Sequence, residues 1–111
     1  LGNHDRRSAF FDCYADGAIK SLVPGYAVYR IETPHVDFVM LDSLNEDPSL
    51  ARKGCGEFPA DVQRWMMSEI PRMKGPLILA AHHPLDEMCV GDRPFRSFLA
   101  SSRMNAIKAV A

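Results

Sequence analysis

Two short segments of the sequence hold the residues best suited to chemistry. The first is Gly2-Asn3-His4-Asp5 and the second is His82-His83-Pro84. The Asn3 side chain offers a carbonyl oxygen that suits a divalent cation. His4 stands beside a carboxylate that can fix its tautomer and favour its protonated form. An imidazole such as His82 can bind a metal through a neutral nitrogen or move a proton near neutral pH.

Each segment also has a purely structural interpretation. The first can be a turn in which Asp5 caps the helix that follows it. The second can be a pair of loop histidines, one solvated and one hydrogen-bonded to the backbone. Adjacent residues of an extended segment point to opposite sides, so only one of His82 and His83 is expected to face a given site. His82 directly follows an apolar run, and open α/β sheets bind ligands just beyond the carboxyl ends of their strands.

The elements that must position these segments follow an α/β order. Apolar spacing predicts helices over 7–15, from Pro59 to Met73, and from Phe95 to the end with a break near Ser101-Ser102. The second helix is expected to present a core-facing apolar stripe, which consists of Val62, Trp65, Met66, Ile70 and Met73. Apolar runs predict strands over 26–32, 36–41 and 77–81, the last of them central in its sheet. The short connection between the first two strands favours an antiparallel hairpin. The more continuous apolar runs at 36–41 and 77–81 predict strands that are buried on both faces. Residues 42–56 and 85–94 are expected to be loops.

The composition excludes several classes of function. Lys plus Arg total 13 and Asp plus Glu total 14, which gives a net charge of -1. No field of one sign is therefore available to attract a nucleic acid polymer or an anionic membrane. The longest clean apolar run, 77–81, is far short of the ~20 residues of a membrane span. The three cysteines form no C-x-x-C pair, which favours reduced thiols and a cytoplasmic location.

Both ends of the sequence are typical of a segment cut from a longer protein. The chain begins at Leu1 without an initiator Met or a leader. It ends over 105–111 in a pattern that predicts a helix still in progress, with no Gly stop. We therefore expect that these residues are part of a larger chain.

Together the two segments carry a family resemblance. Gly-Asn-His-Asp is followed, 78 positions from His4 to His82, by a strand that ends in His-His-Pro. This arrangement resembles the calcineurin-like metallophosphoesterases, and within them the class III cyclic-nucleotide and glycerophosphodiester phosphodiesterase branch. The sequence from Val36 to Ser43 resembles the family strand that ends in Leu-Asp-Ser/Thr. The sequence from Gly56 to Trp65 resembles the family helix with the pattern Gln-x-x-Trp. The similarity extends from Leu1 to about Met88.

The resemblance implies a fold and a reaction. Residues 1–111 would be the central portion of a single metallophosphoesterase domain, an α/β fold that is part of a four-layer α/β/β/α sandwich truncated at both ends. Two metal ions, Fe, Mn or Zn, would hold a hydroxide that attacks a small phosphodiester of the cyclic nucleotide or glycerophosphodiester class.

It also implies residue roles. Asn3 and His82 would be metal ligands. His4 would act on the phosphate or the leaving group, and Asp5 would orient His4. His83 would be a wall residue rather than a ligand. His35 matches no motif and is expected to be an exposed turn residue. Arg93 can pair with a second phosphate or be a solvated loop arginine.

The sequence also departs from the family pattern. The Asp-x-His and Gly-Asp-x-x-Asp motifs that should precede Asn3 are absent, as is the Gly-His-x-His motif that should follow His82. The parent protein is therefore expected to be an enzyme and the isolated chain to be inactive. Two other functions stay open. One is a metal-free structural or interaction domain, and the other is a hydrolase in which His82 or His83 activates Ser43, although no Gly-x-Ser-x-Gly elbow is present.

Overall fold

Four strands form one mixed sheet in the order β1-β2-β3-β4. The computed structural model describes residues 1, 5–47, 56–83, 93–100 and 108–110. The strands are β1 (Tyr29–Glu32), β2 (Asp37–Met40), β3 (Leu77–Ala80) and β4 (Lys108–Val110). β1 pairs antiparallel with β2, while β2, β3 and β4 run parallel to one another. The predicted hairpin and the central position of the third strand are thus confirmed, and the described chain is a small mixed α/β domain.

The first two helices begin and end close to the predicted residues, whereas the last is shorter than predicted. They are α1 (Arg7–Cys13), α3 (Ala60–Glu69) followed by the short 3-10 turn η1 (Ile70–Arg72), and α4 (Arg93–Leu99). Pro59 precedes α3, and Asp61 lies in its first turn, where a negative charge favours the helix N-terminus. Of the described helices, none combines the length and the apolar character that crossing a membrane requires.

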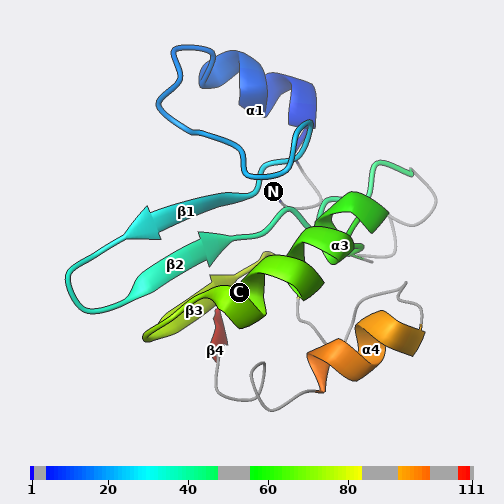
Figure 1. Cartoon of the computed structure of the whole chain (residues 1–111). Coiled ribbons are helices and arrows are strands. Elements are labelled where there is room, and N and C mark those ends of the chain that lie inside the picture. Colours follow the sequence, from blue (N-terminus) through cyan, green and yellow to red (C-terminus); the bar gives the residue numbers. More distant parts are fainter. Residues whose placement is uncertain (2–4, 48–55, 84–92, 101–107, 111) are drawn as a thin grey trace.

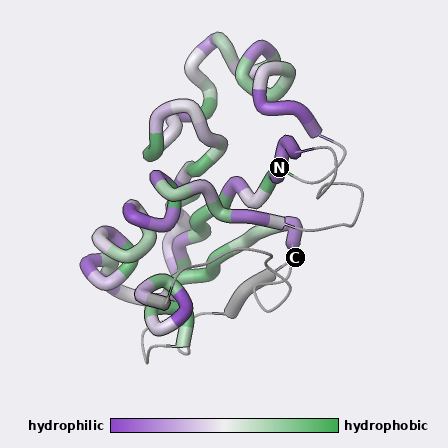
Figure 2. The backbone as a smooth tube through the Cα atoms, turned by 90° about the vertical axis from the view of Figure 1, so that its right-hand side faces the viewer, coloured by the Kyte–Doolittle hydropathy of each residue, from purple (hydrophilic) through white to green (hydrophobic). Residues whose placement is uncertain are grey.

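One face of the sheet carries the core (Figure 1). Val39, Leu77 and Leu79 are buried against α3, which crosses this face and contributes Val62, Met66 and Ile70. These three helical residues were predicted as part of the core stripe, because their spacing places them on one side of a helix. Figure 2 shows the resulting alternation of hydrophobic and hydrophilic residues along the helices. Phe58 and Phe95 close the core with their rings edge to face, 6.0 Å apart between centroids.

The opposite face of the sheet is only half covered, which corrects the prediction that two strands are buried on both faces. Its side chains are Tyr29, Ile31, Phe38, Met40, Ile78 and Ala80, which the strand register places in two rows. Ile31 is 46% exposed, and the others are half-buried. The physical reason is that α3 and η1 bury their apolar residues on the other face alone. A continuous apolar run shows that both faces can be buried, but not what covers them.

The end of the chain is a strand where a helix was predicted. Lys108–Val110 pair in parallel with Ile78–Ala80. The alanines of this segment favour a helix in isolation, but the free edge of β3 offers a row of backbone hydrogen bonds that only a strand can complete. α4 ends at Leu99, and the predicted break near Ser101-Ser102 lies outside the described residues.

Candidate functional site

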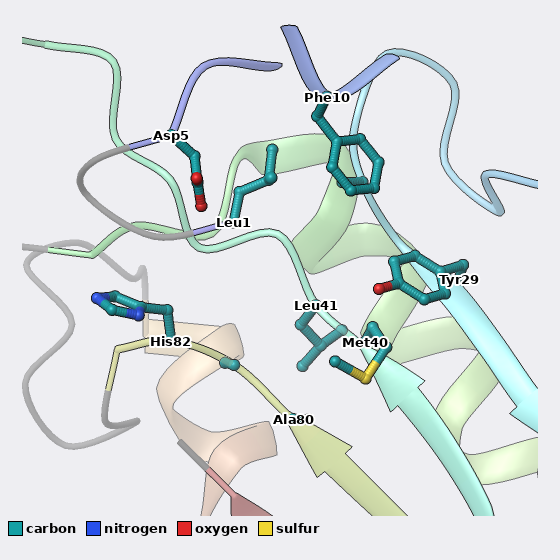
Figure 3. A pocket seen from close by; sticks show the side chains of 10 residues that line it. Leu1, Asp5, Phe10, Tyr29, Met40, Leu41, Ala80 and His82 are labelled. Atoms are coloured by element: carbon teal, nitrogen blue, oxygen red, sulfur yellow. The ribbon is translucent and has the colours of Figure 1, made fainter. Parts of the chain in front are cut away.

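A pocket of about 410 Å³ lies at the carboxyl ends of β2 and β3 (Figure 3). This volume is within the usual range for small-molecule sites. Residues of the sheet edge form one side and residues of the N-terminal segment form the other. The lining side chains are Leu1, Asp5, Phe10, Ala27, Tyr29, Met40, Leu41, Ala80, Ala81 and His82. The pocket therefore has the position in which α/β sheets bind ligands.

Two of the predicted site residues meet in this pocket. Asp5 from the first segment and His82 from the second both line it, and both side chains are exposed. In Figure 3 they lie on the same side of the pocket, opposite Phe10 and Tyr29. Asn3 and His4, the predicted metal ligand and proton donor, lie outside the described residues. Leu1 and Asp5, the described residues on either side of positions 2–4, both line the pocket.

Polar contacts attach the N-terminal segment to the sheet. α1 has no fully buried residue, so apolar burial contributes little to its placement. Instead, Nε of Arg7 donates to Oδ2 of Asp42 over 2.7 Å, and Nη2 of Arg7 donates to Oδ1 of Asp42 and to the Leu44 carbonyl. The Arg7 guanidinium also lies over the Tyr26 ring, 4.9 Å from its centroid. Arg7 thus fixes the segment that carries Asp5 at the rim of the pocket.

Asp42 is the acceptor on which this attachment depends. It is fully buried. Besides the two bonds from Arg7, its carboxylate accepts the backbone N–H groups of Ala27 and Leu44, over 3.0 and 3.1 Å. A buried carboxylate needs such a set of donors to offset the loss of water. Sequence reasoning placed Asp42 at the end of a strand and missed this role; the signal available was a charged residue directly after an apolar run.

His83 points away from the pocket into the protein. Its side chain is 5% exposed, and its Nδ1 lies 2.8 Å from Oγ of Ser43, which is fully buried. The Ser43 hydroxyl also accepts the backbone N–H of His83 over 3.4 Å. Gly56 lies directly against the ring, since a Cβ at Gly56 would be 2.3 Å from Cγ of His83. His83 is not among the described residues that line the pocket, and its expected role as a wall residue of a metal site stays a prediction.

Burial favours the neutral form of His83. The loss of water lowers the pKa of His83 below its usual value, and the neighbouring charge of His82 lowers it further. Its Nε2 is buried and has no hydrogen-bond partner among the described residues. The two adjacent histidines therefore differ as the alternation of an extended segment requires: one ring faces the pocket and the other faces the interior.

Aromatic and apolar side chains form the far wall of the pocket. Tyr29, Met40 and Ala80 are register partners on three neighbouring strands, so they share one face of the sheet. Phe10 of α1 stacks on Tyr29, with 6.4 Å between centroids and 22° between ring planes. Burial raises the pKa of the Tyr29 hydroxyl, and Tyr14 adds to this shift. Sequence reasoning missed this wall, because it depends on strand register and on where α1 lies.

None of the remaining candidates is among the described residues that line the pocket. His35 is exposed in the turn between β1 and β2, as predicted. Arg93 begins α4, and its side chain lies outside the described part of the chain. Cys13 is a free, exposed thiol. Within the described ranges, no three His, Cys, Asp or Glu side chains gather as a metal site.

Comparison of the chain with models of protein families, with curated proteins and with solved structures finds no match.

Proposed function

We propose that this chain is the central part of a metal-dependent phosphodiesterase of the calcineurin-like kind. The observation that supports the proposal best is the meeting of Asp5 and His82 in one pocket, although they are 77 positions apart in the sequence. The two motifs that carry the family resemblance thus supply residues to the same edge of a parallel sheet. If the two segments resembled the family motifs only by chance, there would be no reason for them to meet in one pocket.

The half-covered face of the sheet supports the fold that the proposal requires. Two sheets of a sandwich pack face to face at about 10 Å through their apolar side chains. The row of Ile31, Phe38 and Ile78, which lies farther from the pocket, offers such a surface. In the proposed four-layer α/β/β/α sandwich, a second sheet covers this row, and residues 1–111 are the central portion of the domain. The free thiol of Cys13 agrees with the cytoplasmic location that belongs to this proposal.

The residues present supply part of a metal's ligand set. The exposed imidazole of His82 at the pocket suits Fe, Mn or Zn. Asn3 would add an amide oxygen, and the other ligands of the family pattern have no counterpart in the sequence. When bound, two such metals would supply a hydroxide of lowered pKa. His4 would donate a proton to the leaving oxygen, and Asp5 would hold the His4 ring in position.

A serine hydrolase is the second candidate, because Ser43 and His83 lie in hydrogen-bond contact. A serine nucleophile must reach a substrate, however, and Ser43 is fully buried while His83 is 5% exposed. Neither residue is among the described residues that line the pocket. We therefore assign this pair a structural role and keep the phosphodiesterase as the proposed function.

The test measures hydrolysis of bis(p-nitrophenyl) phosphate in the presence of Mn²⁺. The protein assayed is the proposed parent protein, which would contain residues 1–111 together with the Asp-x-His, Gly-Asp-x-x-Asp and Gly-His-x-His motifs. We expect His82→Gln to lower kcat/KM at least about 100-fold, because even residues behind metal ligands commonly contribute 10–100-fold. His35→Gln, which changes an exposed histidine far from the pocket, is the matched control and should keep full activity. Both variants should unfold within about 0.5 kcal/mol of the wild type.

Two results would contradict the proposal. Full activity in His82→Gln would remove the imidazole from the chemistry. Absence of metal-dependent activity in the wild type would favour the metal-free structural domain. The isolated chain of 111 residues is the reference and should be inactive, because it lacks the remaining ligand motifs.

A further inference from the structure

The strand β1 forms one edge of the sheet, because it pairs with β2 alone among the described strands. Figure 1 shows it at the end of the sheet opposite β4. Its residues Arg30, Ile31 and Glu32 are exposed. A free strand edge presents backbone N–H and C=O groups that a further strand can pair with. We infer that β1 pairs antiparallel with β1 of a second copy of this chain, with Ile31 of both copies at the two-fold axis.

The hydrogen bonds of β2 indicate which backbone groups of β1 point away from the sheet. The N–H groups of Asp37 and Leu41 donate to carbonyl groups directly before and within β3, over 3.1 and 2.8 Å. Because these groups alternate in direction along a strand, the even-numbered residues of β2 bond to β1. Their register partners in β1 are the odd-numbered residues. The backbone groups of Arg30 and Glu32 therefore point outward, where none of the described strands pairs with them.

The side chains favour the register in which Arg30 of each copy faces Glu32 of the other. Charges at a strand edge commonly prevent pairing between copies, but these two are opposite in sign. A two-fold axis at Ile31 creates two opposite-charge pairs, and each such cross-strand pair is favourable. The Arg30 guanidinium already contacts Asp37, and its Nε lies 3.7 Å from Oε1 of Glu32. The Glu32 side chain is nevertheless 75% exposed, which leaves its carboxylate accessible to a second arginine.

The neighbouring registers that also bring outward residues together are unfavourable. An axis at Arg30 places two arginines opposite each other. It also pairs Glu32 with Val28, whose carbonyl already accepts the Leu22 N–H over 2.7 Å. An axis at Glu32 places two glutamates opposite each other and pairs Arg30 with Pro34, which has no N–H to donate. Of these three registers, the axis at Ile31 alone makes both the backbone groups and the charges complementary.

The apolar side of the strand fits the same axis. Ile31 is 46% exposed, whereas its register partner Phe38 and the next residue in the row, Ile78, are half-buried. At the axis the two Ile31 side chains face each other in a non-hydrogen-bonded pair, in which side chains lie closest. This contact removes apolar surface from water, and the row continues into the second copy. The pairing uses neither Asp5 nor His82, so it is independent of the proposed phosphodiesterase.

Charge reversal tests the pairing, because each single variant repels its own copies and attracts the other variant. Sedimentation equilibrium of the 111-residue chain over a roughly hundredfold range of concentration should show a monomer–dimer equilibrium, weak because the paired segment is short. Arg30→Glu and Glu32→Arg should each weaken self-association about tenfold or more, since the axis repeats every like-charge pair. An equimolar mixture of the two variants should dimerise again. Arg64→Glu, which reverses an exposed charge on α3, is the matched control and should dimerise like the wild type.

A cross-link tests the register without changing these charges. Ile31→Cys places two thiols at the axis, where the Cα atoms of a non-hydrogen-bonded pair are about 4.5 Å apart and within reach of a disulfide. Thr33→Cys is the control, because Thr33 of one copy faces Tyr29 of the other. Both variants are made in a background in which the three native cysteines are replaced by serine. Mild oxidation should link two copies at position 31 and leave the control unlinked, as peptide mass mapping would show.

Three results would overturn the inference. The first is a wild-type chain that stays monomeric at every concentration, which would leave the edge to some other partner. The second is self-association of the two charge variants as strong as that of the wild type, which would place the contact elsewhere on the chain. The third is equal cross-linking of Ile31→Cys and Thr33→Cys, which would exclude the axis at Ile31.

Discussion

Two polar groups lie at the same edge of the sheet and differ in their access to solvent. The buried polar cluster consists of Arg7, Asp42, Ser43 and His83, whose carboxylate, hydroxyl and backbone groups bond to one another or to nearby backbone. The pocket pair, Asp5 and His82, is exposed. The peptide bond between His82 and His83 joins the two groups, and their rings meet edge to face at 4.9 Å between centroids.

The buried polar cluster supports the site, whereas the exposed pocket pair is placed to carry out its chemistry. Buried polar groups are stable only when their partners are in place, so removing one member has a large cost in free energy. Exposed groups contribute little to stability and are available to a ligand. We infer that the buried polar cluster fixes the backbone from which His82 and Asp5 reach the pocket. Substitutions in the cluster should therefore change stability first, whereas substitutions in the pocket pair should change function alone.

The largest effect is expected for Asp42→Ala. This change removes the acceptor of the Ala27 N–H group and that of the Leu44 N–H group, and it removes the buried carboxylate partner of Arg7, which keeps the Leu44 carbonyl and Glu46. Removing one partner of a buried ion pair commonly lowers the unfolding free energy by about 3–5 kcal/mol. Urea denaturation would measure this loss. Asp61→Ala breaks the exposed pair with Arg64 and is the control, with an expected loss of about 1 kcal/mol or less. Equal losses in the two variants would show that the buried polar cluster does not support the fold.

Gly56→Ala should have the next largest effect. The added Cβ would lie 2.3 Å from Cγ and 2.5 Å from Cβ of His83, and the base of a side chain cannot move away without its backbone. Overpacking of this kind commonly costs about 1–3 kcal/mol. The measurement is a double-mutant cycle with His83→Ala. In the His83→Ala background the same glycine substitution should cost almost nothing, and additive losses would contradict the contact.

Ser43→Ala tests the bond that holds His83. It removes the hydroxyl that accepts the His83 backbone N–H and contacts Nδ1. A buried polar group that loses its partner costs about 1–3 kcal/mol of unfolding free energy, and we expect a loss in this range. Ser68→Ala, which removes a hydroxyl from the exposed side of α3, should change the unfolding free energy by less than about 0.5 kcal/mol. A thermal melt of both variants decides between these outcomes.

The smallest effect is expected on the pocket side. The neutral hydroxyl of Tyr29 is favoured in the folded protein, so the pKa of Tyr29 is raised above the usual value for tyrosine, which is about 10. The unfolded chain loses this proton first, so the stabilising contribution is complete below about pH 10 and falls as the pH rises beyond it. A spectrophotometric titration should show one late tyrosine, and Tyr29→Phe should remove that step. A titration curve unchanged by Tyr29→Phe would contradict the burial of the hydroxyl.

Local patterns were enough to predict much of the fold. The β-forming residues around the turn at His35 predicted the hairpin, and the spacing of Val62, Met66 and Ile70 predicted the core face of α3. The end of the apolar run at Ala81 correctly placed His82 beyond a strand. Each of these features depends on neighbours in the sequence, which is the information that a single chain carries most directly.

Contacts between distant segments were not predictable in the same way. β4 forms because β3 has a free edge, and Val110 gives no sign of that edge in its own sequence context. Gly56 and His83 are in contact although they are 27 positions apart, and no periodicity of the sequence indicates this contact. The aromatic wall needs both the register of Tyr29 with Met40 and the placement of α1. These are tertiary choices, and tertiary context overrides local preference.

The parallel pairing of β2 with β3 also has a consequence for the order of folding. The hairpin closes across residues 33–36, whereas the pairing of Asp37 with Leu77 joins residues 40 positions apart. Longer loops lose more chain entropy on closing, and non-local pairings slow folding. The pocket needs both events, since Tyr29 and Met40 come with the hairpin while Ala80 and His82 come with β3. We expect the pocket to be among the last features that the chain acquires, after α3 has docked and brought β3 to the sheet.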